Sequence, residues 1–287
     1  IDQMAKKNLL GSKTGSGFYK RIKNSDGKSE ILSLDLRTLE YKSTKKVLFE
    51  TMGFAKKIED VSERFSVLVN GKDKAGEFYR RNFGSLFAYI QNRVPEICDD
   101  IYKIDDALKA GYGWQYGPFE VWNSIGLKQG VELIKSLGYK PTGWINKMIQ
   151  NGVDKFYSVE NGNSTYYDLN ACKFKIKPGY ESFIILKNLH ENKTIWENKD
   201  SIITDIGDGV INLEFRSKMN TIGEGVLQGI NKSLEIGEKN FRGLVIGNEG
   251  AHFSAGANLG MIFMMSVEQE YDEINMAIKI FQDTMMK

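Results

Sequence analysis

The order of the secondary-structure signals is the feature that most restricts the fold of this chain. Apolar residues recur at helical spacing over about 43–150, and short aromatic and β-branched runs then dominate to about residue 216. After that point a helical pattern, a short apolar strand and further helices alternate. Helices, then hairpins, then alternating strand and helix are typical of two architectures, with a boundary expected between residues 135 and 200. The length of 287 residues also indicates about two domains.

The first architecture is predicted to be helical. Residues 43–60 carry an apolar stripe, with Ser43 or Thr44 expected as the N-cap. A longer pattern over 77–102 should kink or end at Pro95, because proline lacks the N–H that an inner helical turn needs. Shorter helices are expected at 104–109, 118–124, 127–137 and 142–150.

The later segments are predicted to be strands joined by turns and one crossover helix. Asn161-Gly162-Asn163 between aromatic and β-branched residues indicates a hairpin. Short strands are expected at 183–189, 194–196, 201–207, 209–215 and 242–247, and a helix at 221–239. Near the N-terminus, the polar residues 22–34 are interpreted as a linker.

Composition excludes several function classes. Lys+Arg 39 against Asp+Glu 37 leaves a net charge of +2, so no strong field favours nucleic acid or a membrane surface. Apolar runs are too short for membrane insertion. Cys98 and Cys172 are far apart, which favours reduced thiols and a cytoplasmic location. Neither His190 nor His252 lies in a cluster with metal-ligand spacing, so no metal is expected.

Both ends of the chain are expected to be boundaries within a longer polypeptide. The first residue is Ile1 rather than Met, and the chain stops at Lys287 inside an amphipathic helical pattern without a stop signal.

Two glycine-containing segments are similar to nucleotide-binding motifs, but their spacing or the residues before them do not match those motifs. Residues 111–117 place the third glycine one residue late, and a helical rather than a strand pattern precedes them. Gly27-Lys28-Ser29 would end a phosphate-binding loop only if residue 22 were glycine, and it is Ile22. We therefore expect no nucleotide site in either segment.

The segment HFSAGANLG, residues 252–260, has a context that suits a different chemistry. It follows an apolar strand pattern and leads into a helix, and small side chains leave its main chain accessible. Unpaired N–H groups at a helix N-terminus, aimed at a carbonyl oxygen, form part of an oxyanion hole. The alternative is that the small residues only allow close packing of strand and helix, and spacing alone does not decide between the two.

This segment, extended to 247–260 and taken with 209–235, resembles the N-terminal part of the crotonase (enoyl-CoA hydratase/isomerase) family. The family pattern is a strand, a loop with Lys and Asn, a helix, a strand, and then Phe, Ser or Ala, and Ala-Gly-Ala-Asp. The resemblance implies a loop that holds a CoA thioester and polarises its carbonyl group.

Carried over by position, the resemblance implies that the backbone N–H of Ala257 is one oxyanion-hole donor. It also implies a loop near the CoA thioester made of Lys218, Asn220, Ser254, Gly256 and Asn258. Two positions depart from the family: Ser217 replaces the usual Pro in a loop one residue shorter, and Asn258 replaces the usual Asp. Neither change removes the backbone donor.

The family's second donor and its catalytic carboxylates would follow later than Lys287, so the resemblance implies half of a site. The acidic residues after the loop are interpreted as a solvated helix face rather than as catalytic groups. They are Glu268, Glu270, Asp272 and Glu273.

The N-terminal region resembles the helical C-terminal domain of 3-hydroxyacyl-CoA dehydrogenases. Residues 9–21 are similar to the closing signature of that domain, and 90–126 to the later part of a second copy. This implies that Asp105 starts a helix. It also implies that Phe119 and Trp122 pack into the core.

Two further positions bear on this resemblance. The family's usual Asp before the final Ile-Gly is Asn123 here. Trp114 and Trp122 have the side chains to stack on an adenine, but aromatic residues in helical bundles are mostly core, and a core role is the prediction for them.

Together the resemblances imply an α+β, multidomain chain, in the order found in fused β-oxidation proteins. An all-α domain of the dehydrogenase C-terminal type would be followed by a β-rich connector and the N-terminal part of an α/β crotonase fold. The expected domains are 1–34, the end of a first dehydrogenase helical domain and a linker; 35–140, a second helical domain; 141–200, a connector with hairpins; and 201–287, a truncated crotonase domain.

The implied function is part of a fatty-acid β-oxidation enzyme that acts on acyl-CoA thioesters. The whole protein would oxidise 3-hydroxyacyl-CoA with NAD and hydrate 2-enoyl-CoA, with the NAD site and the dehydrogenase His–Glu pair outside this chain. The chain alone is expected to be inactive, with a homo-oligomer formed through the crotonase domain as a further expectation. The alternative is a crotonase-like platform for docking or oligomerisation, without catalysis.

Overall fold

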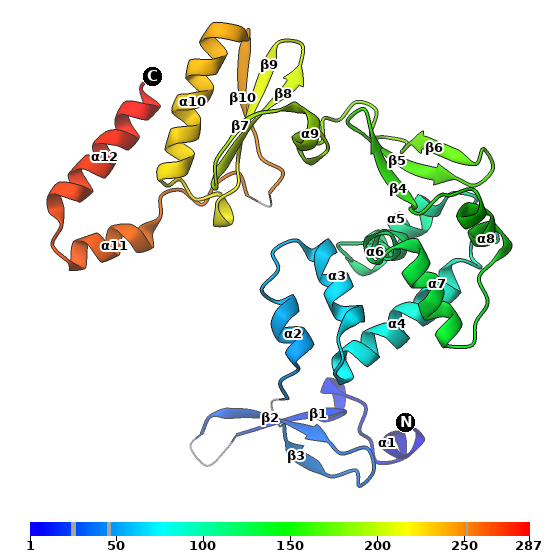
Figure 1. The fold of residues 1–287 in the computed structure, drawn as a ribbon. Coiled ribbons are helices and arrows are strands. Elements are labelled where there is room, and N and C mark those ends of the chain that lie inside the picture. Colours follow the sequence, from blue (N-terminus) through cyan, green and yellow to red (C-terminus); the bar gives the residue numbers. More distant parts are fainter. Residues whose placement is uncertain (24–26, 45–46, 251) are drawn as a thin grey trace. The chain divides into compact units, whose positions relative to one another are not determined.

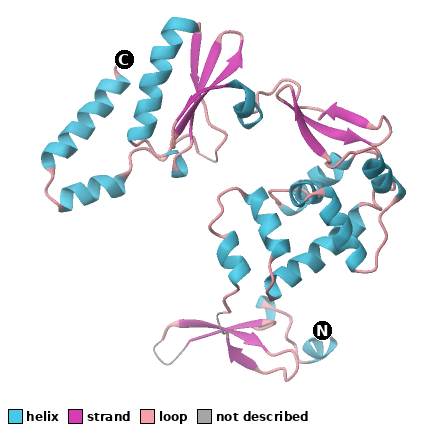
Figure 2. Ribbon diagram, in the orientation of Figure 1, coloured by secondary structure: helices cyan, strands magenta, loops and turns pink. Residues whose placement is uncertain are grey.

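The computed structural model describes residues 1–23, 27–44, 47–250 and 252–287, and within them the strands form three separate sheets (Figure 1). The chain divides into two compact units, Ile1–Arg80 and Arg81–Lys287. The two units are described separately below. Helices and small sheets follow one another along the chain, so the described residues form a mixed α/β structure (Figure 2).

The first unit contains a small antiparallel sheet after two short helical segments, α1 (Asp2–Lys6) and the 3-10 helix η1 (Ser12–Thr14). Its strands are β1 (Tyr19–Lys23), β2 (Ser29–Leu34) and β3 (Tyr41–Ser43), in the order β1-β2-β3. The Tyr41 hydroxyl closes the sheet by donating to the Gly17 carbonyl over 2.6 Å.

The interpretation of residues 22–34 as a linker is wrong outside residues 24–26, which lie outside the described residues. Ile22 pairs with Glu30 across a β1–β2 ladder, and Leu34 is buried. The polar composition concealed an alternation in β2, in which every second side chain faces inward.

Three helices follow: α2 (Glu50–Ala55), α3 (Val61–Asn70) and α4 (Lys74–Ile90). The expected N-cap at Ser43 or Thr44 is wrong, because Ser43 ends β3 and α2 begins only at Glu50. Asp60 caps α3 by accepting a hydrogen bond from the Ser62 N–H over 2.8 Å. Helix α4 ends at Ile90, ahead of Pro95, in agreement with the predicted stop.

In the second unit all four predicted short helices are present. They are α5 (Ile101–Tyr112), α6 (Pro118–Ile125), α7 (Leu127–Ser136) and α8 (Gly143–Gln150). Gly113 ends α5 in a left-handed conformation, with φ of 65°, and Pro118 occupies the first turn of α6. The helical prediction therefore holds from Glu50 to Gln150, whereas the start of the expected all-α domain includes strand β3.

The core of these helices is aromatic. Trp122 is fully buried and stacks on Phe87, with ring centroids 4.7 Å apart. Phe156, which follows α8 in the chain, packs edge-on against Trp122 at 5.0 Å. The core prediction is confirmed for Phe119 and Trp122, but Trp114 is 42% exposed and is not a core residue.

The predicted hairpin at Asn161-Gly162 joins β4 (Tyr157–Glu160) to β5 (Asn163–Asp168), and β6 (Lys173–Ile176) completes the sheet. Asn161 and Gly162 have φ of 52° and 81°, as a two-residue turn between twisted strands requires. The strand predicted at 183–189 is wrong, because helix α9 (Leu186–Lys193) begins inside it. Leu186 is the buried residue of that helix.

The third sheet has the order β10-β9-β8-β7. It consists of β7 (Thr194–Glu197), β8 (Ser201–Gly207), β9 (Val210–Phe215) and β10 (Gly243–Ile246). Strands β9 and β10 are parallel, and α10 (Glu224–Asn240) connects them, which gives a βαβ unit. Ile203, Leu213 and Val226 form the buried centre between this sheet and α10.

Two helices end the described chain, α11 (Leu259–Val267) and α12 (Tyr271–Met285). The alternation of helix and strand predicted after residue 216 is thereby confirmed. Of the helices built from described residues, none combines the length and the apolar character needed to cross a membrane.

Candidate functional site

The loop between β10 and α11 is the candidate functional site. Strands β9 and β10 run in parallel, so the segments that leave their carboxyl ends meet at one edge of the sheet. Ligands of α/β sheets commonly bind at this edge. The segment after β9 contains the 3-10 helix η2 (Lys218–Asn220), and the segment after β10 contains residues 252–258.

Hydrogen bonds join these two segments directly. The N–H of Ala255 donates to the carbonyl of Met219 over 3.1 Å, and the Ser254 hydroxyl donates to the carbonyl of Asn220 over 2.6 Å. In return the Asn220 side-chain amide donates to the carbonyl of His252 over 2.9 Å. The tertiary structure therefore brings together the two segments that the family resemblance implied.

The backbone of both segments is held in a conformation that L residues rarely adopt. Met219 and Asn220 have φ of 56° and 52°, and Gly256 has φ of 80°. A left-handed conformation costs a non-glycine residue about 1 kcal/mol or more. The bonds from Ala255 and Ser254 compensate for this strain by fixing the Met219–Asn220 turn.

Ala257 presents its N–H beside this junction. The carbonyl of Gly256 is taken by the Ile222 N–H over 2.8 Å, whereas among the described residues nothing accepts a hydrogen bond from the Ala257 N–H. Ala257 is exposed, and its methyl group is too small to cover its own backbone. The geometry thus leaves a backbone donor accessible at the start of α11.

The other site residues that the family resemblance implies have different places in the structure. Asn258 caps α11, where its side chain accepts a hydrogen bond from the Met261 N–H over 3.3 Å. Gly256 donates to the Ser254 hydroxyl over 3.0 Å, so both residues shape the loop from within. Lys218 is exposed in η2.

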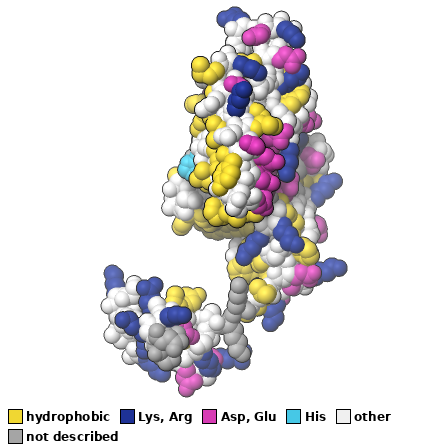
Figure 3. All heavy atoms as spheres, turned by 90° about the vertical axis from the view of Figure 1, so that its left-hand side faces the viewer, with side chains coloured by type: hydrophobic (Ala, Val, Ile, Leu, Met, Phe, Trp, Pro, Cys, Tyr) yellow, Lys and Arg dark blue, Asp and Glu magenta, His cyan; other side chains and the backbone are white. Residues whose placement is uncertain are grey.

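An apolar groove of about 890 Å³ opens beside Ala257 and Asn258. Its walls are helices α10, α11 and α12. They contribute Leu227, Met261, Met265, Ile274 and Phe281 among others. Figure 3 shows hydrophobic side chains exposed on the face that carries α11 and α12. An accessible N–H at the edge of an apolar groove can bind a carbonyl group attached to a hydrocarbon chain.

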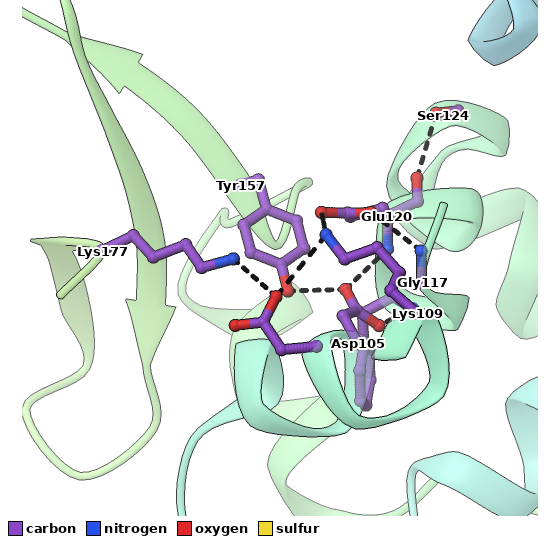
Figure 4. Close-up of polar contacts among 9 residues, drawn as sticks. Asp105, Lys109, Gly117, Glu120, Ser124, Tyr157 and Lys177 are labelled. Carbon is purple, nitrogen blue, oxygen red and sulfur yellow. Dashed lines mark hydrogen bonds and ion pairs between the residues drawn. The ribbon is translucent and has the colours of Figure 1, made fainter. Parts of the chain in front are cut away.

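A second polar cluster lies in the helical part of the same unit, around Asp105 (Figure 4). Asp105 accepts hydrogen bonds from the N–H groups of Phe119 and Glu120 over 2.7 and 3.0 Å, and from the Tyr157 hydroxyl over 2.6 Å. Its expected position at the start of a helix is wrong. Asp105 lies inside α5 and caps the N-terminus of the next helix, α6.

Two ion pairs flank this cluster. Lys109 pairs with Glu120 at 2.7 Å, and Lys177 of the connector pairs with Asp106 at 2.8 Å. Burial raises the pKa of Asp105 to about 7, although its three donors favour the carboxylate. With every oxygen engaged, Asp105 ties α5, α6 and strand β4 together, and the cluster is structural.

Residues 111–117 do not form a dinucleotide-binding loop. Residues 111–117 end helix α5 instead of following a strand, and a side chain on Gly117 would collide with Asp105. The glycine at 117 is therefore explained by close packing. Within the described ranges, no group of three His, Cys, Asp or Glu side chains could hold a metal ion.

One side-chain contact at the carboxyl edge of the third sheet was not indicated by any sequence pattern. His190 Nε2 lies 2.8 Å from the Glu214 carboxylate, although the two residues are 24 positions apart. The strand predicted at 183–189 ends before His190, which the structure places in helix α9.

Known proteins match this chain over 99–100% of its length. The chain is 39% identical over its full length to a Bacillus subtilis (strain 168) protein named "Probable 3-hydroxyacyl-CoA dehydrogenase". Two Rickettsia proteins named "Putative fatty acid oxidation complex trifunctional enzyme" are 26% identical over the full chain (R. felis) and 27% over 99% of it (R. prowazekii). The chain is thus similar to enzymes of fatty-acid oxidation.

The chain matches only part of the length of each relative. The chain spans 36% of the length of the Bacillus protein and 35% of each Rickettsia protein. No protein-family model matches the chain, and no solved structure matches it either.

Proposed function

We propose that this chain is part of a fatty-acid β-oxidation enzyme and contributes half of a site for acyl-CoA thioesters. In the whole protein, the expected reactions are NAD-dependent oxidation of 3-hydroxyacyl-CoA and hydration of 2-enoyl-CoA. The names of the relatives support the dehydrogenase part. The hydratase part rests on the Ala257 loop, and the NAD site is placed outside this chain.

The observation that carries the proposal is the accessible N–H of Ala257 at the edge of the apolar groove. We assign the thioester carbonyl oxygen to this N–H and the acyl chain to the groove between α10, α11 and α12. Addition of water to a 2-enoyl thioester places negative charge on that oxygen. A fixed donor stabilises the charge, and loss of one such donor typically lowers the rate by about 10²–10³.

Lys218 and Asn220 have different roles in this proposal. Asn220 holds the loop through His252 and Ser254, so it positions the Ala257 donor. Lys218 is exposed beside the loop, where its ammonium group suits the anionic part of CoA. The second oxyanion donor and the catalytic carboxylates would come from the remainder of the polypeptide.

The test is Ala257→Trp in the full-length protein, because an indole blocks the groove edge and the path to the N–H. We expect hydratase turnover to fall by at least about 10². The control is Phe253→Trp, which enlarges an exposed side chain of the same loop outside the groove. Unchanged turnover in Ala257→Trp would contradict the proposal.

One observation favours the alternative of a non-catalytic platform. Leu259 and Phe263 of α11 are 75% and 67% exposed, and apolar side chains at such exposure suit a protein interface. Turnover that survives Ala257→Trp, together with a homo-oligomer that Phe263→Glu dissociates in analytical ultracentrifugation, would favour this alternative.

A further inference from the structure

A second hollow, of about 410 Å³, lies at the carboxyl ends of β9 and β10. It is distinct from the apolar groove, because its walls are mostly polar. The side chains that matter are Lys187, His190, Glu214, Arg216, Asn220 and Glu249. Three of these six carry or can acquire a positive charge: two belong to α9, and Arg216 directly follows β9.

Both carboxylates of the hollow are engaged in holding its walls. Glu214 fixes the imidazole ring of His190 at 2.8 Å, and its side chain is 14% exposed against 26% for His190. Glu249, from the loop after β10, accepts a hydrogen bond from the Leu186 N–H at the start of α9. These contacts join α9 to the edge of the sheet.

The lysine and arginine side chains of the hollow can each donate several hydrogen bonds. Arg216 has five N–H donors, and the described contacts show one ion pair, in which Nη1 lies 2.8 Å from Glu197. His190 uses Nε2 for Glu214, and its other ring nitrogen donates to a ligand when the imidazole is protonated. A donor-rich hollow suits a ligand rich in acceptors and negative charge.

We propose that this hollow binds a phosphate group, held by Lys187, His190 and Arg216, with Glu214 orienting the imidazole. Phosphate offers several acceptor oxygens, and lysine and arginine are its usual partners in proteins. Asn220 lines the hollow and also fixes the loop of Ala257. If the proposed function holds, the phosphate is one of those in CoA; otherwise it belongs to a separate phosphate-bearing ligand.

The sequence offers a direct readout, because it contains only two histidines, His190 and His252. We would follow their imidazole signals by NMR in the 287-residue chain while inorganic phosphate is added at constant pH and ionic strength. His252→Gln assigns the signals. We expect a saturable movement of the His190 signal that exceeds any change at His252. A His190 signal that stays unmoved would overturn the proposal.

Matched variants test the assigned donors. Lys187→Met and Arg216→Met should each weaken phosphate binding by about tenfold, as expected for loss of a charged hydrogen bond. Lys193→Met is the control, because Lys193 lies on the same helix but does not line the hollow. Equal affinities in Lys187→Met and the wild type would overturn the assignment.

Parallel titrations with CoA and with dephospho-CoA identify the source of the phosphate and separate this proposal from the proposed function. Phosphate binding without any CoA binding would keep the hollow as a phosphate site and contradict the thioester function. CoA binding that Lys187→Met and Arg216→Met leave unchanged, with no response to phosphate, would keep that function and overturn the phosphate site.

Discussion

At the scale of single residues, Asp105 shows how a buried carboxylate serves architecture. Three donors from two elements converge on it, and the Tyr157 hydroxyl is the one that comes from the connector sheet. Burial raises the pKa of Tyr157 well above its ordinary value, so its hydroxyl remains a donor at any physiological pH. Whether the protein gains or loses stability through Asp105 as the pH rises then follows from the pKa of Asp105 itself.

We expect Asp105 to make the second unit less stable as the pH rises. Its pKa is about 7 in the folded chain against 3.8 for an ordinary Asp, so the folded state binds the proton more tightly. The stabilisation is complete below about pH 4 and is lost by about pH 7, and it amounts to about 4 kcal/mol at most. Urea unfolding between pH 4 and 8 measures this slope.

Two variants check that the slope belongs to Asp105. Asp105→Asn should flatten it, because the amide does not titrate. Tyr157→Phe removes a donor that favours the carboxylate, so it should move the midpoint of the slope to higher pH. An Asp105→Asn variant with the same pH dependence as the wild type would show that other groups are responsible.

At the scale of elements, the α6–α7 contact depends on a glycine. Gly130 of α7 lies against the indole of Trp122, so closely that an added Cβ would overlap the ring nitrogen. That nitrogen also donates to the Leu127 carbonyl over 3.2 Å, which fixes the start of α7. Close approach of these two helices therefore requires the absence of a side chain at 130.

Gly130→Ala should lower the free energy of unfolding by about 1–3 kcal/mol, the usual cost of overpacking a core. Gly111→Ala is the matched control, since Gly111 also lies in a helix but has open space where its Cβ would be. That change should be neutral or stabilising by up to about 1 kcal/mol. Chemical denaturation of both variants makes the comparison, and equal stabilities would refute the packing argument.

At the scale of the whole molecule, the chain contains three sheets within its described residues, and residues 111–117 end helix α5 instead of following a strand of any of them. The relatives span nearly three times the length of this chain, so the proposed NAD site has room outside it.

We expect the 287-residue chain not to bind NAD. Isothermal titration calorimetry with NAD should give no saturable heat, while CoA serves as the ligand that the proposed function predicts to bind. Saturable NAD binding that Gly113→Val abolishes would show that residues 111–117 do form a nucleotide site.

Much of the element order was predictable from local signals. The helices over 101–150, the Asn161-Gly162 turn and the βαβ unit each follow from periodicity or turn chemistry that neighbouring residues determine. The errors occur where local and tertiary preferences differ. Residues 183–189 have the composition of a strand, yet Leu186 begins a helix, and the polar segment around Glu30 pairs as a strand.

The sequence alone determined that small residues follow an apolar strand at 252–260, and their spacing left a backbone donor and close packing as alternatives. Only the tertiary structure decided what surrounds that donor. Residues that are distant in the chain come together in three places. These are the hydrogen bonds from Asn220 and Ser254, the groove along α12, and the pair of His190 with Glu214. Such contacts depend on how strands and helices pack, and no local pattern encodes them.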